Sequence, residues 1–279
     1  MRKQQWALII TGLLLLFGLY FFGNTIAPNK PVIASETATA PAVLTTKDVI
    51  AKYKAGLDTQ QVQTLTQLEN SVVRGDVHNQ QIRVYRQLAS YWTDSLHREE
   101  IGAYYAGEAA KLENSEKNLT FAAHLLLDNT MSATDASMQR WLATKAKELF
   151  EKALLINPNN DSSKIGVGAC YMFGNISENP MQGILAIREI ADKNPDNLYA
   201  QMMLGLGGVQ SGQYDKAAER FLNVIKKQPD NIEAILNLAG AYERMSNKAE
   251  AVKWYKTSLN FIQLPQARKE IEERIKLLQ

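Results

Sequence analysis

Two consecutive stretches, LYAQMMLGLGGVQSGQYDKAAERFLNVIKKQPDN (residues 198–231) and IEAILNLAGAYERMSNKAEAVKWYKTSLNFIQL (residues 232–264), repeat one pattern of large and small residues. When they are aligned from their first residues, positions of similar size coincide: Leu204 with Leu238, Gly205 with Ala239, Ala217 with Ala251 and Phe221 with Tyr255. Apolar residues recur at spacings of three and four, which is the period of an α-helix, and strand-like alternation is absent. The pattern predicts a helical hairpin that is repeated along the chain.

The boundaries between hairpins carry a motif of their own. A proline followed by two Asp or Asn residues occurs three times, as Pro158-Asn159-Asn160, Pro195-Asp196-Asn197 and Pro229-Asp230-Asn231. The proline ends one helix, and the Asp or Asn after it can cap the next helix by accepting a hydrogen bond from a backbone N–H. The motif therefore predicts a further hairpin that begins at Asp161.

These stretches resemble the tetratricopeptide repeat (TPR) family, in which a bulky-small pair and an aromatic residue mark helix A and a small residue, an aromatic residue and a proline mark helix B. The resemblance covers residues 161–197, 198–231 and 232–264. The first repeat needs extra residues in its turn (GNISENP) and matches at Val167, Gly168, Tyr171, Gly183, Ile187, Ile190 and Pro195. The resemblance implies an all-α fold, a TPR-type right-handed α-solenoid of helical hairpins. Small residues are expected where helices A and B cross closely.

Outside these repeats the signal is weaker. Residues 47–160 are interpreted as degenerate hairpins: a helix pair over 47–75, a hairpin over 77–113, and a helix B that ends at Pro158. Residues 265–279 form a charged helix with an apolar face, which is typical of a cap on the last repeat. The expected body is a solenoid of about five hairpins and a capping helix.

The N-terminal sequence has the pattern of a membrane anchor. Residues 1–5 are a basic stub, residues 6–26 are apolar and long enough for a transmembrane helix, and residues 27–46 form a flexible linker with three prolines. The positive-inside rule then places the stub in the cytoplasm and the C-terminal domain in the periplasm of a bacterium, with the protein spanning the inner membrane once. A cleaved signal peptide is the alternative.

Catalytic chemistry is not apparent. The chain has 31 basic and 29 acidic residues, and this balance argues against a nucleic-acid surface. It has one cysteine, Cys170, and three scattered histidines, without phosphate loops or metal-ligand spacings. We therefore expect no enzyme activity, no cofactor, no metal site and no small-molecule substrate. Cys170 and His124 are interpreted as packing residues.

The resemblance implies instead a concave groove that binds a protein or peptide segment, lined by fixed positions of each helix A. Ser162 and Glu233 hold two of those positions. The residues expected to form the binding surface are Ile165, Ala169, Met172, Tyr199, Met202, Leu206, Val209, Leu236, Gly240 and Glu243. Two alternatives stay open: an open groove, or one covered by the C-terminal helix or by tight curvature. On the open-groove interpretation, Met202→Glu should weaken partner binding without unfolding the array.

Three functions are compatible with this organisation. The first is a membrane-anchored TPR scaffold or adaptor for proteins of envelope assembly or secretion. The second is a periplasmic TPR adaptor of cytochrome c maturation that presents apocytochrome, and the third, remote one is an enzyme on a helical scaffold. The anchor, the linker and the repeats favour the first.

Overall fold

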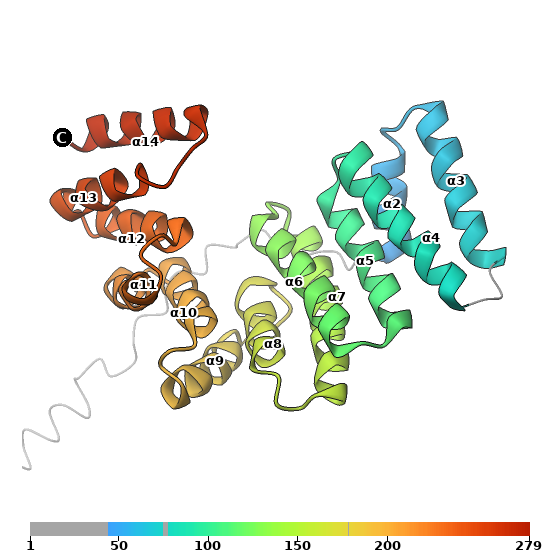
Figure 1. Ribbon diagram of the computed structural model, residues 1–279, viewed down its shortest axis with the longest axis horizontal. Helices are drawn as coiled ribbons and strands as arrows, with labels where there is room; N and C mark the ends of the chain where they lie inside the picture. The colour runs from blue at the N-terminus through green and yellow to red at the C-terminus, as the bar shows by residue number, and fades with distance from the viewer. Residues whose placement is uncertain (1–43, 75–77, 178) are drawn as a thin grey trace, which may run out of the picture. The chain divides into compact units, whose positions relative to one another are not determined.

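The computed structural model describes residues 44–74, 78–177 and 179–279, and all regular secondary structure in these ranges is helical (Figure 1). The elements are α2 (Thr46–Lys54), α3 (Thr59–Arg74), α4 (His78–Ser90), the π-helical segment η1 (Tyr91–Ser95), α5 (Glu99–Glu113), α6 (Glu116–Ser132), α7 (Ala136–Ile156), α8 (Asp161–Phe173), α9 (Met181–Lys193), α10 (Leu198–Gln210), α11 (Tyr214–Lys227), α12 (Ile232–Arg244), α13 (Lys248–Ser258) and α14 (Pro265–Leu278). The all-α prediction is confirmed for these ranges. The segment 6–26, predicted to span the membrane, lies outside them, and none of the helices within them has the length and apolar character to cross a bilayer.

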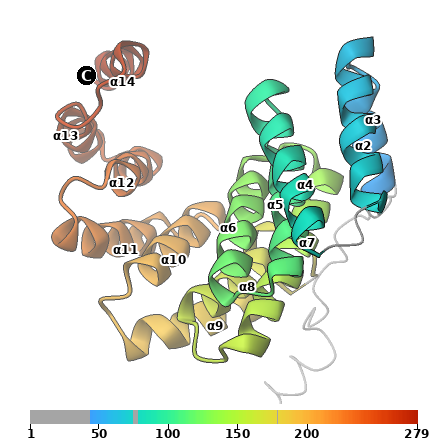
Figure 2. The ribbon, with the colours of Figure 1, turned by 45° about the vertical axis from the view of Figure 1, so that its right-hand side comes forward.

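Helices α4 to α13 form five consecutive hairpins, α4/α5, α6/α7, α8/α9, α10/α11 and α12/α13, and the partners within each hairpin pack closely. From α6 onward, the first helix of each hairpin also contacts the first helix of the next one, which aligns α6, α8, α10 and α12 in one row. Figure 2 shows these hairpins following one another in chain order. The helices α8, α10 and α12 begin at Asp161, Leu198 and Ile232, the residues at which the three repeats were expected to start.

The last residue of each proline motif caps the helix that follows. Asn160, Asn197 and Asn231 are the N-caps of α8, α10 and α12, and each side-chain oxygen accepts a hydrogen bond from the backbone N–H three residues later, at 2.9, 3.1 and 2.9 Å. Such a cap satisfies a donor that the first helical turn leaves without a partner. The recurrence of Asn at this position therefore fixes where each hairpin begins.

Small residues set the distance between the helices of a hairpin. A Cβ atom on Gly168 of α8 would lie 2.7 Å from Ile187 Cγ1 and 2.9 Å from the Gly183 carbonyl oxygen of α9. In the next hairpin, a Cβ atom on Gly205 would lie 2.5 Å from the ring of Phe221. A backbone oxygen at Gly168 and an aromatic ring at Gly205 thus leave no room for a side chain at either position.

The N-terminal helix pair differs from the others. Helix α3 packs against α4, whereas α2 lies against α5 and α7: Tyr53 donates a hydrogen bond to Glu100, and the indole N–H of Trp141 lies 3.4 Å from the Thr46 hydroxyl. Val49, on the apolar face of α2, is 1% exposed. The segment predicted as a helix pair thus contains two helices, α2 and α3, but α2 buries its apolar face against the later hairpins. An ion pair between Lys54 and Glu69, at 2.6 Å, links α2 to α3.

Helix α14 packs on the last hairpin. Its Ile275 joins a small apolar cluster with Ala239, Ala251 and Tyr255. This cluster is separate from the large core that runs through the preceding hairpins. Arg274 of α14 also pairs with Glu243 of α12. The position of α14 is that of a cap on the final repeat.

Candidate functional site

Side chains from three hairpins meet at the imidazole of His124. Its Nε2 atom lies 2.8 Å from the Ser162 hydroxyl of α8, and its Nδ1 atom lies 3.4 Å from the Tyr199 hydroxyl of α10. Ser162 and Tyr199 each follow directly on the first residue of their helix, and Glu233 holds the same place in α12. We call Phe121, His124, Asp128, Ser162, Tyr199 and Glu233 the His124 surface.

Aromatic packing holds the imidazole in place. The ring of His124 meets the rings of Phe150 and Tyr199 edge-to-face, with centroid distances of 5.0 and 5.2 Å. Burial lowers the pKa of His124, so that its imidazole is neutral at pH 7. Burial, and then the negative charge of Asp128, raise the pKa of the Tyr199 phenol well above its usual range. The centre of the surface is therefore uncharged.

Two carboxylates flank this centre. Asp128 and Glu233 are exposed to solvent, and yet surrounding protein raises the pKa of Asp128, while burial and then the charge of Asp128 raise the pKa of Glu233. No ion pair in the part of the chain that the structure describes includes either carboxylate. Their charges are left without a cationic partner.

Phe121 adds an exposed aromatic ring to the same helix face. It lies three residues before His124 and seven before Asp128, spacings that place all three on one side of α6. Its side chain is 63% exposed. The His124 surface therefore combines an uncovered apolar ring with two unpaired carboxylates.

The ten residues predicted to line the groove divide into two groups. Six are partly exposed: Tyr199, Leu206, Val209, Leu236, Gly240 and Glu243. Of these, Glu243 is already paired with Arg274 of α14. Four are buried, with exposed fractions of 0% for Ile165 and Ala169 and 7% for Met172 and Met202. The prediction of a contact role needs correction for these four, because they pack between adjacent hairpins.

Glycines in α10 explain part of this burial. A Cβ atom on Gly207 would lie 2.2 Å from the terminal methyl group of Met172. Because Gly207 has no side chain, α10 can approach α8 closely. Helix α14 does not cover these four residues: its Ile275 belongs to the separate terminal cluster, whereas Ile165 and Met202 belong to the large core. It contacts the predicted groove only at α12, where Arg274 pairs with Glu243. Adjacent hairpins thus bury four of the ten residues that the repeat pattern assigned to the groove.

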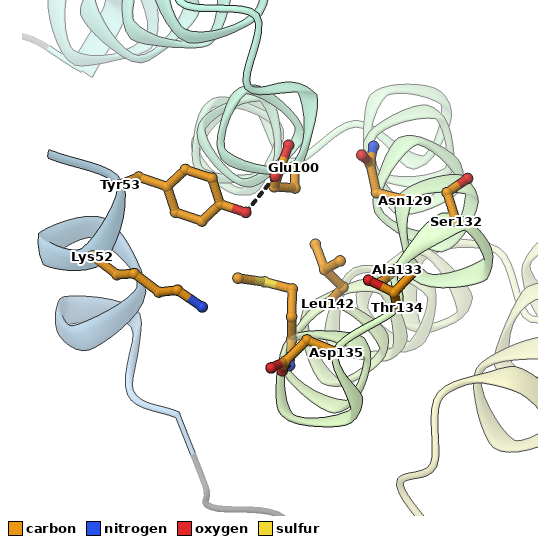
Figure 3. A pocket seen from close by; sticks show the side chains of 10 residues that line it. Lys52, Tyr53, Glu100, Asn129, Ser132, Ala133, Thr134, Asp135 and Leu142 are labelled. Carbon is orange, nitrogen blue, oxygen red and sulfur yellow. Dashed lines mark hydrogen bonds between the residues drawn. The ribbon is translucent and has the colours of Figure 1, made fainter. Parts of the chain in front are cut away.

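A hollow of about 300 Å³ lies between α2, α5 and the junction of α6 and α7. Figure 3 shows Tyr53 pointing from α2 towards Glu100 of α5, with Lys52 at the same opening. Asp135, on its far side, caps α7 by accepting a hydrogen bond from Met138 N at 2.8 Å. Glu100 and Asp135 are thus both engaged within the protein, which gives them structural roles.

The described residues contain no group of His, Cys, Asp and Glu that could hold a metal ion. Cys170 is buried, and burial raises the pKa of its thiol to about 12. A thiol that stays protonated at neutral pH is a poor nucleophile. The packing role predicted for Cys170 agrees with this environment.

The C-terminal hairpins identify the kind of repeat. Residues 209–269 match the tetratricopeptide repeat family. This TPR match covers α11, α12, α13 and the start of α14. No curated protein shows significant similarity to the chain.

Several solved structures resemble the chain at low sequence identity. A TPR protein from Parabacteroides merdae superposes with a TM-score of 0.51 at 15% identity, over 83% of this chain and 85% of that one. YrrB, described as a TPR protein with an unusual peptide-binding site, has a TM-score of 0.42 at 16% identity, over 68% of this chain and 91% of its own. MamA from Desulfovibrio magneticus has a TM-score of 0.42 at 18% identity, over 64% of this chain and 94% of its own. The family match over residues 209–269 and the superposition on the Parabacteroides merdae protein indicate a TPR-like array of helical hairpins.

The residues that sequence reasoning missed lie in α6. Phe121, His124 and Asp128 precede the recognisable repeats, so the TPR pattern assigned them no role. The sequence signal that could have identified them is their spacing: His124 and Asp128 lie three and seven residues after Phe121, on one face of an otherwise apolar helix.

Proposed function

We propose that the protein is a membrane-tethered TPR scaffold that binds a segment of another protein across the His124 surface. The observation that carries the proposal is the exposed ring of Phe121, beside side chains that three hairpins bring together. Exposed aromatic rings next to partly exposed apolar side chains are typical of protein-binding surfaces. Repeat arrays commonly bind an extended or helical segment across such stacked helices.

The sequence of the first 46 residues supports the tether and the compartment. Arg2 and Lys3 precede the apolar segment 6–26, and no basic residue follows it until Lys30. This asymmetry favours a cytoplasmic N-terminus and a periplasmic repeat array at a bacterial inner membrane. The partners are then proteins of the envelope or secreted proteins, and envelope assembly or secretion is the proposed process.

Photo-crosslinking tests the binding surface. A photoreactive phenylalanine analogue replaces Phe121 in the full chain in intact cells. In the matched control it replaces Leu185, which is 54% exposed on α9, away from the His124 surface. We expect discrete adducts of higher mass from position 121 only. Equal adducts from both positions, or none from 121, would contradict binding at this surface.

Protease accessibility tests the compartment. An epitope follows Gln279, and intact spheroplasts are treated with protease from outside. We expect loss of the epitope without lysis, because the repeat array faces outward. Protection until lysis would place the array on the cytoplasmic face and would reject the periplasmic part of the proposal.

A further inference from the structure

A second hollow, of about 200 Å³, lies between helix α9 and the hairpin of α10 and α11. Apolar side chains form the inner part of its lining: Met172 of α8 is buried, and Ile184 of α9 and Leu204 of α10 are half-buried. The backbone of Gly207 and Gly208 adds to the same lining. We call Met172, Ile184 and Leu204 the apolar floor.

The remaining lining is rich in positive charge. It includes three cationic side chains, which we call the basic cluster, namely Arg188 of α9 and Lys216 and Arg220 of α11, and one carboxylate, Glu219. No ion pair within residues 44–74, 78–177 and 179–279 includes any of these four side chains. The excess of two positive charges at this one hollow equals that of the whole chain of 279 residues. A recess lined by one sign of charge attracts ions of the opposite sign.

A buried amide holds one cation of the cluster in place. Nη1 of Arg220 donates a hydrogen bond to Oε1 of Gln201 at 3.0 Å. Gln201 is 1% exposed, and its Nε2 atom donates to the carbonyl oxygen of Pro195 at 3.0 Å. Both ends of the amide are therefore engaged, and the guanidinium, which has five N–H groups, keeps donors for a ligand.

A chain of hydrogen bonds positions a second cation. Nζ of Lys216 donates to Oε1 of Gln213 at 2.9 Å, and Nε2 of Gln213 donates to the Ser211 hydroxyl at 3.0 Å. That hydroxyl donates to the carbonyl oxygen of Gly207 at 2.9 Å, which ties the chain to α10. Because the acceptor of the lysine is an uncharged amide, its positive charge is not neutralised.

These features select an anion that has an apolar part. Guanidinium and ammonium groups bind carboxylates and phosphates through charge-assisted hydrogen bonds. The apolar floor offers thioether and aliphatic surface, which an organic group covers and an inorganic ion does not. A cavity of about 150 Å³ holds benzene, so this hollow has room for about six to ten non-hydrogen atoms.

We infer that the hollow between α9 and the hairpin of α10 and α11 binds a small organic anion. Its carboxylate or phosphate group contacts the basic cluster, and its short apolar body lies on the apolar floor. The inference goes beyond the proposed function, because the hollow shares no residue with the His124 surface. Either proposal can therefore fail without the other.

Binding of a panel of small anions to the purified full chain in mild detergent tests the inference. The panel contains linear, branched and aromatic carboxylates and phosphate monoesters of about six to ten non-hydrogen atoms. Each is paired with a neutral amide or alcohol of the same shape. Acetate and inorganic phosphate serve as anions without an apolar body. Isothermal titration calorimetry at about 20 mM salt measures the affinities.

Three proteins are compared: the wild type, the double variant Arg188→Gln/Lys216→Gln, and the control Arg83→Gln/Lys152→Gln. The double variant keeps the arginine that Gln201 holds, so that this buried amide retains its partner. The control residues are exposed on α4 and α7, and the control changes the net charge by the same amount. Circular dichroism and thermal unfolding check that all three proteins are equally folded.

We expect at least one organic anion of the panel to bind the wild type and the control with a Kd below about 1 mM. The same anion should bind the double variant about tenfold more weakly or worse. Its neutral counterpart should lose a similar factor on the wild type, because it lacks the charge. Acetate and inorganic phosphate should also bind more weakly, because they leave the apolar floor uncovered. Raising the salt concentration to about 500 mM should weaken the binding.

Contrary results are equally distinct. Equal affinity for the wild type and the double variant, or an equal loss in the control, would overturn the inference. Neutral counterparts that bind as well as the anions would remove the role of the basic cluster and would overturn it too. Binding of inorganic phosphate alone would indicate an adventitious ion only, and no binding by any organic anion at millimolar concentration would likewise reject the site. Crosslinking from position 121 tests the His124 surface separately.

Discussion

The hydroxyl of Tyr199 lies 3.4 Å from Nδ1 of His124, although 75 residues separate them in the chain. The other ring nitrogen of His124 contacts Ser162 of the intervening helix α8 at 2.8 Å. Three successive hairpins, those that begin with α6, α8 and α10, therefore meet at one imidazole. A change in the charge of this ring acts on the packing of all three.

Stability should fall as His124 is protonated. Burial lowers the pKa of folded His124 below its ordinary value near 6.5, so the unfolded chain binds the proton more tightly. The contribution of His124 to stability is therefore largest at about pH 7.5 and declines as the pH falls towards about 5.5. Urea unfolding followed by circular dichroism, with the wild type and His124→Gln compared at each pH, measures this contribution.

In the difference between the two proteins, the contributions of the other titrating groups to the unfolding free energy cancel. Asp128 and Glu233 have raised pKa values and therefore give the opposite slope, but they are present in both proteins. The difference in unfolding free energy between the wild type and His124→Gln should shrink as the pH falls. A difference that grows or stays constant would mean that the folded protein accommodates the charged imidazole.

Neutralising the two carboxylates should stabilise the protein at neutral pH. Because the pKa values of Asp128 and Glu233 are raised, ionising them costs more in the folded than in the unfolded chain. Asp128→Asn/Glu233→Gln should raise the midpoint of thermal unfolding at about pH 7.5 by on the order of one or two degrees. The gain should vanish near pH 4, where the carboxylates of the wild type become protonated. A midpoint lower than that of the wild type would show that the carboxylates make stabilising contacts.

The repeat boundaries could be predicted because their signals are local. The Asn that caps α8, α10 or α12 and the proline two residues before it stand together in the sequence, and the small residues recur at a fixed spacing. Helices α6 and α7 have 17 and 21 residues, whereas α8 and α9 have 13 each. That extra length obscured the register of the earlier hairpins. The position of α2 had no sequence signal, because its contacts with Glu100 and Trp141 join residues that are 47 and 95 positions apart in the chain.

The candidate site was less predictable, because exposure depends on how closely hairpins stack. Ile165 holds a groove position in the repeat pattern, but neighbouring hairpins bury it completely. Glycines of α10 such as Gly207 allow a close approach that a standard repeat register does not describe. His124 was assigned to packing because the contacts that give it a role, with Ser162 and Tyr199, lie 38 and 75 residues away.

Met202→Glu should unfold the array before it affects binding. The Met202 side chain is 7% exposed and belongs to the large core, so a carboxylate there would be buried without a partner. We expect a loss of about 3 kcal/mol in unfolding free energy. The control Met181→Glu, at a methionine 49% exposed at the start of α9, should change stability by no more than about 0.5 kcal/mol. Equal stability of the two variants would show that the structure tolerates a carboxylate at position 202, and the predicted role of Met202 in the binding surface would stand.

Glycine-to-alanine substitutions should have opposite effects at two positions of the repeats. On Gly168 the new Cβ atom would lie 2.9 Å from a backbone oxygen of α9, which cannot move without opening the hairpin. We expect Gly168→Ala to reduce the unfolding free energy by about 1–3 kcal/mol, although alanine favours a helix. On Gly240 of α12 the nearest atom is the Tyr255 hydroxyl, at 4.0 Å, so Gly240→Ala should gain about 0.5–1 kcal/mol from helix propensity alone.

Chemical unfolding of both variants measures these changes side by side. Because both glycines lie inside a helix, the difference between the variants isolates the close approach of α8 and α9 from the general effect of adding a methyl group. Stabilisation by Gly168→Ala would mean that this hairpin opens at little cost. Small residues would then mark the family pattern without setting the helix spacing in this protein.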